Sequence, residues 1–248
     1  MNKVLLITGG SRGIGAATAR LAARQGWAVA VNYASRPDAA DQVVHDITQN
    51  GGQAIAVQAD VADEAQVLAM FEQVDARLGR LGGLVNSAGV VDVAARVDEM
   101  SLARWRRMID INILGSFLCA REAVRRMSTR HGGSGGAIVN LSSVAAVLGA
   151  PGQYVDYAAT KGAIDTFTVG LAREVATEGI RVNGVRPGVI DTEIHASGGQ
   201  PERAWQLANS IPMKRPGTAE EIANAIVWLL SEQASYATGS LLDVTGGR

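Results

Sequence analysis

The sequence predicts an α/β fold, with one doubly wound parallel sheet and helices on both of its faces. Short apolar runs rich in Val, Ile and Ala alternate along the chain with longer stretches of helical period. These runs are apolar almost throughout, as expected of strands that are covered by helices on both sides. The strand–helix alternation favours parallel pairing. A length of 248 residues with no linker and no internal repeat suits a single domain spanning 1–248.

The elements follow one another in a regular order. Strands are expected at 4–8, 28–32, 54–58, 83–87, 137–143, 180–185 and 241–245. Helices are expected at 14–25, 38–50, from near 63, over 101–127, and around 153–163. A last helix should begin at Thr218, because Glu221 three residues later has the spacing of a capping box.

Two segments interrupt this rhythm. Residues 131–136 read HGGSGG and offer almost nothing to bury, which predicts a flexible surface loop. Residues 190–217 are rich in Gly, Ser and Pro and are too long for a simple connection. We expect this second segment to be a mobile lid over a substrate site.

Composition argues against several classes of protein. Lys and Arg total 23 against 24 Asp and Glu, without a basic block, so neither nucleic acid nor an anionic membrane is an expected partner. No apolar run approaches the ~20 residues of a bilayer span. Cys119 is the only cysteine, so no internal disulfide can form and a reduced, cytoplasmic compartment is expected. His45, His131 and His195 lack metal-ligand spacing, so no metal is expected.

A glycine-rich loop, TGGSRGIG at 8–15, joins the first expected strand to the first helix. Glycines at 9, 13 and 15 let the backbone turn sharply and approach a pyrophosphate, while the following helix directs free N–H groups at the phosphates. A tight strand–helix turn would also explain a lone glycine trio. Its place in the first βα unit favours dinucleotide binding.

The spacing is G-x-x-x-G-x-G, and here the sequence resembles the short-chain dehydrogenase/reductase family. The family signature T-G-x-x-x-G-[IL]-G is matched by Thr8, Gly9, Gly13, Ile14 and Gly15. The resemblance runs along almost the whole chain, and 3-oxoacyl reductases and glucose dehydrogenases are the members most similar in overall pattern. It implies a Rossmann-type fold that binds a nicotinamide dinucleotide.

Further family motifs follow in order. Asp60-Val61 stands where the family contacts adenine, and 86–89 reads NSAG where the family usually has N-N-A-G, so Ser87 departs from the pattern. Residues 187–192 match P-G-x-x-x-T, the family segment beside the nicotinamide amide. The resemblance thus implies these cofactor-binding residues: Gly9, Ser11, Arg12, Gly13, Ile14, Gly15, Asn32, Tyr33, Ser35, Asp60, Val61, Asn86, Ala88, Gly89, Tyr157, Lys161, Pro187, Gly188, Ile190 and Thr192.

The end of the second strand bears on the choice between NADP(H) and NAD(H). An acidic residue there would hold the ribose 2′-hydroxyl of NAD. The chain reads NYASR over 32–36 and has no carboxylate until Asp38. Arg12, Ser35 and Arg36 are candidates to bind a 2′-phosphate; a solvated surface charge would explain Arg36 equally well, and would explain Arg12 less well. We expect NADP(H) rather than NAD(H).

The segment 153–163, QYVDYAATKGA, places two tyrosines ahead of one lysine. Tyr157 and Lys161 are four residues apart, which on a helix brings their Cβ atoms within ~5–6 Å. Tyr154 lies two turns from the lysine, ~10 Å along the axis at ~1.5 Å per residue, and is expected to border the substrate pocket or to pack there. We expect the ammonium of Lys161 to lower the pKa of Tyr157 from ~10 toward the range useful for acid–base catalysis.

By the same resemblance, Tyr157 and Lys161 are the catalytic pair, and Lys161 also binds the nicotinamide ribose hydroxyls. The family's serine usually precedes the tyrosine by thirteen residues, but that position is Val144, which cannot hydrogen-bond a carbonyl. One extra residue in the following loop favours Ser143 over the neighbouring Ser142.

Asn112, within IDINILG at 109–115, is the fourth expected catalytic residue. An asparagine inside a helix is unfavourable because it competes for backbone hydrogen bonds. The resemblance implies a local distortion of the helix there and a water-mediated proton relay to Lys161.

These observations predict an NADP(H)-dependent oxidoreductase that interconverts an alcohol and a ketone or aldehyde. A non-catalytic dinucleotide sensor or scaffold of the same fold is the alternative, which the four catalytic candidates argue against. The resemblance also implies a homotetramer built on the helices around 101–127 and 154–177. The small-molecule substrate stays open among 3-oxoacyl thioesters, sugars, polyols, steroids and other carbonyl compounds.

Overall fold

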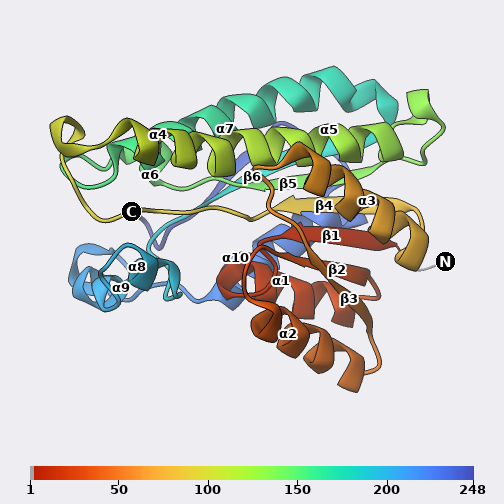
Figure 1. The fold of residues 1–248 in the computed structure, drawn as a ribbon, viewed down its shortest axis with the longest axis horizontal. Helices are drawn as coiled ribbons and strands as arrows, with labels where there is room; N and C mark the ends of the chain where they lie inside the picture. Colours follow the sequence, from red (N-terminus) through yellow and green to blue (C-terminus); the bar gives the residue numbers. More distant parts are fainter. Residues whose placement is uncertain (1–2) are drawn as a thin grey trace.

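The computed structural model describes residues 3–248, and seven strands within them form one parallel sheet (Figure 1). The strand order is β3-β2-β1-β4-β5-β6-β7, so the direction of winding reverses between β1 and β4. In such sheets ligands bind outside the carboxyl ends of the strands at the reversal point. The strands are β1 Val4–Thr8, β2 Ala28–Tyr33, β3 Gln53–Gln58, β4 Leu81–Asn86, β5 Gly136–Leu141, β6 Ile180–Pro187 and β7 Leu241–Val244.

Helices cover both faces of the sheet, as predicted (Figure 1). The side chains of β1 alternate between two apolar cores: Leu5 and Ile7 face one layer of helices, and Val4 and Leu6 face the other. The first layer contains α1 Gly13–Arg24, α2 Pro37–Gln49 and α10 Ala219–Leu230. The second contains α3 Glu64–Leu78, α5 Gly115–Met127 and α7 Val155–Val175, with α4 Leu102–Ile109 leading into α5. Three short helices are α6 Ala145–Leu148, α8 Ile194–Ser197 and α9 Arg203–Gln206.

Local signals account for several boundaries. The hydroxyl of Thr218 accepts a hydrogen bond from the N–H of Glu221 at 3.2 Å, and the Glu221 carboxylate accepts one from the N–H of Thr218 at 2.8 Å. This confirms the capping box at the start of α10. The expected helix over 101–127 is interrupted by a π-helical turn, Asp110–Leu114, between α4 and α5.

The segment 131–136 is packed more tightly than its composition predicted. The amides of Gly133 and Gly135 donate to the carbonyls of Ser128 and Met127, each at 2.8 Å. A side chain at Gly133 would collide with the backbone of Met127. The expectation of a loose loop is therefore wrong, because glycine lets the backbone itself pack against the end of α5.

Membrane insertion through a helix finds no support in this fold. Among residues 3–248, no helix combines the length and the apolarity that crossing a bilayer requires.

Candidate active site

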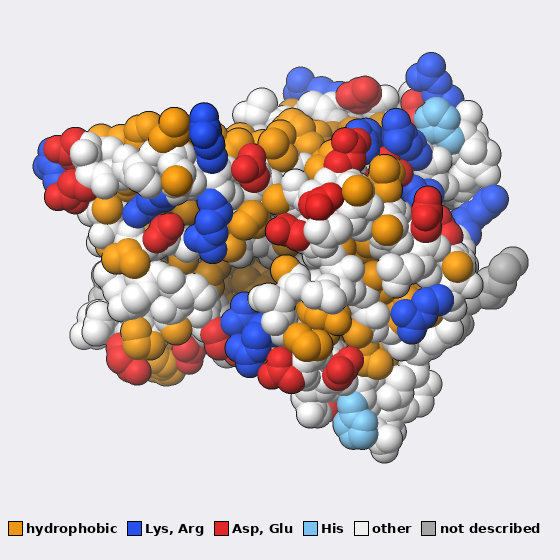
Figure 2. All heavy atoms as spheres, viewed as in Figure 1, with side chains coloured by type: hydrophobic (Ala, Val, Ile, Leu, Met, Phe, Trp, Pro, Cys, Tyr) orange, Lys and Arg blue, Asp and Glu red, His pale blue; other side chains and the backbone are white. Residues whose placement is uncertain are grey.

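A cleft of about 830 Å³ opens at the carboxyl ends of the strands. In Figure 2, which shows the molecule in the same view as Figure 1, a hollow lies near the centre of the visible face, with basic and acidic side chains along its rim. Most of the predicted site residues line the cleft: Gly9, Ser11, Arg12, Gly13, Ile14, Gly15, Asn32, Tyr33, Ser35, Asp60, Val61, Ala88, Gly89, Ser143, Tyr157, Lys161, Pro187, Gly188, Ile190 and Thr192. Two predicted residues, Asn86 and Asn112, are buried behind its wall.

The loop 8–15, which we call the glycine cradle, forms one end of the cleft. Gly9 and Gly13 have φ values of +62° and +50°, which side-chain-bearing residues rarely adopt. A Cβ atom at Gly9 would lie 2.8 Å from Cα of Ala88, and one at Gly15 would collide with the carbonyl oxygen of Gly9. No side chain caps the N-terminus of α1, and its first turn contains no acidic residue. Its free N–H groups and dipole suit an anion, so the cradle fits the pyrophosphate of a dinucleotide.

Buried polar side chains hold the cradle in place. The hydroxyl of Thr8 accepts hydrogen bonds from the N–H groups of Ser87 and Ala88, both at 3.1 Å. Asn32 accepts from the N–H of Gly9 at 3.1 Å and donates to the carbonyl of Ala59 at 3.0 Å. Although Asn32 was expected at the cofactor, these bonds of its amide connect the ends of β1, β2 and β3. Its side chain therefore shapes the wall of the cleft.

A second buried polar chain stands behind β4 and β5. Asn86 and Asn140 are paired across these strands, and the Asn86 amide donates to the Asn140 side chain at 2.9 Å. Asn140 in turn donates to the hydroxyl of Thr168 on α7 at 2.9 Å. Sequence reasoning missed Asn140 and Thr168. An asparagine inside the apolar run 137–143 was the available signal.

The residues expected near a 2′-phosphate lie beside the cradle, at the end of β2. Arg36 donates two hydrogen bonds to the carboxylate of Asp38, at 3.2 and 3.1 Å, and both side chains are exposed. Arg12, by contrast, forms no ion pair with any residue in the described part of the chain. Of the two arginines, Arg12 is the one that is free to meet an anion in the cleft.

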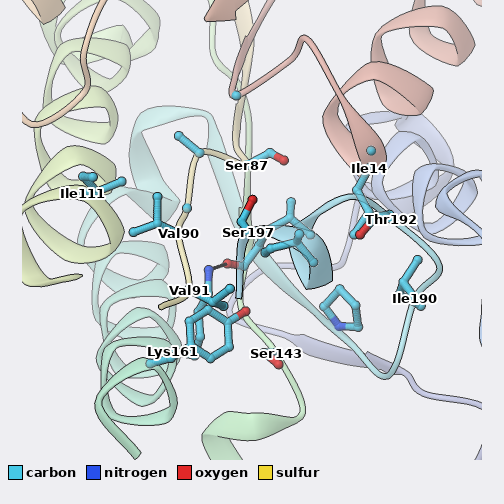
Figure 3. A pocket seen from close by; sticks show the side chains of 18 of the residues that line it. Ile14, Ser87, Val90, Val91, Ile111, Ser143, Lys161, Ile190, Thr192 and Ser197 are labelled. Carbon is cyan, nitrogen blue, oxygen red and sulfur yellow. Dashed lines mark hydrogen bonds between the residues drawn. The ribbon is translucent and has the colours of Figure 1, made fainter. Parts of the chain in front are cut away.

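Ser143, Tyr157 and Lys161 line the cleft together, and we call them the polar floor. In Figure 3, Ser143 and Lys161 lie across the cleft from Ile14 and Thr192. Ser143 follows β5; its hydroxyl accepts a hydrogen bond from the N–H of Ala145 at 3.1 Å and lies close enough to the phenol of Tyr157 to act on the pKa of that group. The ammonium of Lys161 donates to the carbonyl of Leu141 at 2.6 Å and lies 5.6 Å from the centre of the Tyr157 ring.

The geometry separates the two candidate serines. Ser142 is buried and donates its hydroxyl hydrogen to the carbonyl of Lys161 at 3.1 Å, so this group is committed to the backbone of α7. Ser143 instead presents its hydroxyl to the phenol of Tyr157. Only Ser143 is placed beside the tyrosine.

The electrostatics of the polar floor differ from the expected pattern. Burial raises the pKa of Tyr157 to about 12, although the hydrogen bond from Ser143 acts in the opposite direction. Burial also lowers the pKa of Lys161 to about 8, while the negative charge of Asp165 raises it. Our expectation that the pKa of Tyr157 falls toward the working range is wrong for this structure. Desolvation of the phenol dominates, and the ammonium is directed at the carbonyl of Leu141.

Asn112 lies in the π-helical turn, so the expected helix distortion is confirmed. Its amide accepts from the N–H of Val90 at 2.8 Å and donates to the carbonyl of Val90 at 3.0 Å. A Cβ atom at Gly89 would lie 3.4 Å from Oδ1 of Asn112 and 3.6 Å from Nζ of Lys161. Both groups therefore lie close to the same glycine of the cleft wall.

The segment 190–217 borders the cleft beyond the polar floor. Tyr154 immediately precedes α7 and is buried at the cleft wall, which confirms that it borders this pocket. Arg203, on α9, donates to the side chain of Gln153 at 2.6 Å and lies 5.3 Å from the centre of the Tyr154 ring. These contacts join the segment to the loop before α7.

Two other groups are poor candidates for chemistry. Cys119 is buried, and burial raises the pKa of its thiol to about 12, so the reactive thiolate is disfavoured. Within residues 3–248, no cluster of three or more His, Cys, Asp or Glu side chains is arranged to hold a metal ion.

Known proteins resemble this chain over almost its entire length. A family model described as Enoyl-(Acyl carrier protein) reductase matches residues 9–248. The uncharacterized oxidoreductase YgfF of Escherichia coli (strain K12) is 57% identical over 99% of each chain. Glucose 1-dehydrogenase 2 of Bacillus subtilis (strain 168) is 40% identical over 99% of this chain and 94% of its own. A solved mutant of a Serratia marcescens short-chain dehydrogenase/reductase is 37% identical, with a TM-score of 0.91 over 99% of this chain and 97% of that one.

Proposed function

The chain belongs to the short-chain dehydrogenase/reductase family of NAD(P)-type oxidoreductases, and from this premise we propose an NADP(H)-dependent enzyme that interconverts an alcohol and a ketone or aldehyde. One observation carries the proposal. A glycine cradle suited to a dinucleotide and a polar floor of Ser143, Tyr157 and Lys161 occupy two ends of one cleft. A sensor or scaffold would need only the first of these.

In this proposal the bound nicotinamide supplies or accepts the hydride. Tyr157 handles the proton: in carbonyl reduction its phenol donates a proton to the substrate oxygen as negative charge develops there. Burial keeps the phenol protonated at neutral pH, which is the form that this direction requires. In alcohol oxidation the phenolate takes the proton back. Ser143 orients and polarises the carbonyl with its hydroxyl, next to the proton donor.

Lys161 and Asn112 support this proton transfer. With a pKa of about 8, Lys161 is mostly an ammonium ion at pH 7, so it can bind the ribose hydroxyls of the cofactor and stabilise the phenolate that Tyr157 becomes. Asn112 holds the backbone at Val90 and lies against the same glycine as the ammonium. In this position we assign it to the proton supply of Lys161.

The preference for NADP(H) rests on charge at the cradle. Arg12 lies in the cleft wall, and Ser35 and Arg36 line the cleft just after the adjoining strand β2. Arg36 donates two hydrogen bonds to Asp38, so the carboxylate partly neutralises its charge and competes with a phosphate for its N–H groups. We propose that Arg12 is the main 2′-phosphate contact and that Arg36 assists it. A higher kcat/KM with NADH than with NADPH would overturn this assignment.

We also propose one domain over 1–248, with 190–217 as a substrate lid, in a cytoplasmic homotetramer. Large apolar side chains are exposed on the layer that contains α4, α5 and α7, where a second copy would cover them; they are Leu102, Ile109, Leu114, Phe117 and Val155. Phe117 stacks on Phe167 with ring centres 3.9 Å apart, which presents a rigid aromatic surface. Light scattering on the purified protein tests the tetramer, and a monomer at micromolar concentration would refute it.

The test of the proposed activity is NADPH oxidation against a panel of carbonyl compounds. The panel contains 3-oxoacyl thioesters, sugars, ketones derived from polyols, and steroids. Turnover with at least one class is expected. Tight NADPH binding without turnover of any compound in either direction would instead favour the sensor or scaffold.

A further inference from the structure

A third polar residue, Asp165, follows Tyr157 and Lys161 on the same face of α7. It lies four residues after Lys161, so the two side chains are neighbours on the helix surface. Both side chains are buried, with 5% of Lys161 and 8% of Asp165 exposed. A buried carboxylate is unfavourable unless it is paired. The partners of Asp165 therefore need an explanation.

Arg186, on β6, satisfies one oxygen of this carboxylate. Its Nε and Nη2 atoms both lie 2.9 Å from Oδ2 of Asp165. The other oxygen, Oδ1, is buried and has no hydrogen-bond partner among the residues that the structure describes. Paired arginines and carboxylates often use two parallel hydrogen bonds to two oxygens. Here both contacts end on Oδ2, and Oδ1 is left without a hydrogen-bonding partner in the interior.

The surroundings of Lys161 contain little other charge. From α7 it faces the neutral phenol of Tyr157 and the carboxylate of Asp165. From β5 its ammonium meets the carbonyl of Leu141, and beyond the end of β4 it lies near Gly89, where a Cβ atom would stand 3.6 Å from its Nζ. From β6, Arg186 is turned to Asp165, and its Nη1 atom lies 3.4 Å from the exposed Asp243 of β7. Asp165 is thus the one carboxylate in this set that acts on the lysine.

We propose that Asp165, oriented by Arg186, is a positioning residue whose unpartnered carboxylate oxygen keeps Lys161 an ammonium ion in the buried polar floor. The inference rests on the proposed function, because it assigns Asp165 a role through Lys161. The charge of Lys161 can also be measured by titration, without any turnover of substrate.

The expected consequence has a definite sign. Burial already lowers the pKa of Lys161 to about 8, and the charge of Asp165 opposes that fall. Asp165→Asn keeps the shape of the side chain and removes its charge, so the pKa of Lys161 should fall further. The expected fall is roughly one unit, which is a tenfold change in the protonation equilibrium of the lysine. More of the lysine is then a neutral amine at pH 7 to 8, and such an amine stabilises the phenolate less.

The experiment is an NMR titration of the lysine side chains in protein labelled with ¹³C,¹⁵N-lysine. The chain contains only Lys3, Lys161 and Lys214, so the Lys161 signal is identified by its loss in Lys161→Met. The parent is compared with Asp165→Asn and Asp165→Glu. Asp243→Asn is the matched control, because Asp243 also contacts Arg186 but is 56% exposed. The pH profile of kcat/KM is measured on the same four proteins.

A fall in the Lys161 midpoint in Asp165→Asn, with a smaller change in Asp165→Glu and none in Asp243→Asn, supports the proposal. An unchanged midpoint in folded Asp165→Asn, or an equal fall in Asp243→Asn, overturns it. If the midpoint falls but the pH profile stays in place, Asp165 does set the charge of Lys161, and it is the assigned catalytic role of Lys161 that fails. If Asp165→Asn does not fold, the double variant Asp165→Asn/Arg186→Met removes both charges of the pair, so no buried charge is left unpaired. The Lys161 midpoint should fall in this variant as well.

Discussion

The two ends of the cleft are built on different physical principles. The glycine cradle is shaped by backbone: positive φ angles, a close approach to Ala88, and neutral hydrogen bonds that backbone N–H groups donate to Thr8 and Asn32. The polar floor is built from ionisable side chains whose charge depends on burial. The glycine cradle should therefore be sensitive to any side chain that is too large for its close contacts. The polar floor should be sensitive to pH, because the exclusion of water sets the pKa values of its side chains.

Apart from the loss of the Tyr157 phenol, the largest effect at the polar floor is expected from the serine pair. Ser143→Ala removes the hydroxyl beside Tyr157 and should lower kcat by ~10²–10³, the usual effect of losing a donor that stabilises developing charge. NADPH affinity should be unchanged, because the cradle is untouched. Ser142→Ala is the control: it loses one hydrogen bond to the backbone of α7, about 1 kcal/mol of stability, and little of kcat. Steady-state kinetics distinguish the two, and the reverse order would move the assignment to Ser142.

Glycine substitutions test the steric end. Gly15→Ala places a Cβ atom against the carbonyl of Gly9 and should destabilise the protein by ~1–3 kcal/mol while weakening NADPH binding. Gly170→Ala is a matched change in α7, at an exposed position where no atom lies within 4 Å of the added Cβ. It should stabilise the protein by up to ~1 kcal/mol. Urea unfolding and fluorescence titration with NADPH measure both effects, and equal outcomes for the two glycines would contradict a cradle defined by close contact.

A pH profile tests the electrostatic end. Tyr157, with a pKa of about 12, stays protonated up to pH 10, whereas Lys161 loses its proton near pH 8. The value of kcat/KM for carbonyl reduction should therefore be level below pH 7 and should fall above pH 8, approaching tenfold per pH unit. NADPH binding through the cradle should change less over this range. A profile that stays level to pH 10 would remove Lys161 from the assigned role.

The smallest effect is expected at the exposed ion pair beside the cradle. Asp38→Asn frees Arg36 and should raise the preference for NADPH over NADH, by less than about fivefold, because exposed ion pairs are weak and screened by salt. Arg12→Ala should lower the same preference more strongly. The ratio of kcat/KM for the two cofactors is the measurement. A shift toward NADH in Asp38→Asn would show that Arg36 does not contact the 2′-phosphate.

Most of the fold was predictable, because its signals are local. Each expected apolar run overlaps a strand, and the capping box at Thr218 starts α10 as expected. The break in the helix over 101–127 is less visible in periodicity, since it depends on Asn112 bonding to Val90 far from it in sequence. The loop at 131–136 was misjudged because side-chain composition does not report backbone packing.

Most of the residues that line the candidate site were predictable from the sequence, but the direction of their pKa shifts was only partly so. The glycine spacing and the pair Tyr157–Lys161 are sequence features, and the structure brings them into one cleft. The direction of the Tyr157 pKa was missed because it is set by how completely the folded chain excludes water from the phenol. The buried chain from Asn86 through Asn140 to Thr168 was missed because its members come from three separate segments.

The most direct test of the account is kcat and NADPH affinity of Tyr157→Phe, measured side by side. The phenyl ring keeps the packing of the polar floor and removes only the proton donor. The account predicts that kcat falls by ~10²–10⁴, the range of a lost general acid, while the NADPH Kd stays within about twofold of the parent, a change of less than ~0.5 kcal/mol. Turnover close to that of the parent would contradict the central claim that the phenol at this end of the cleft transfers the proton.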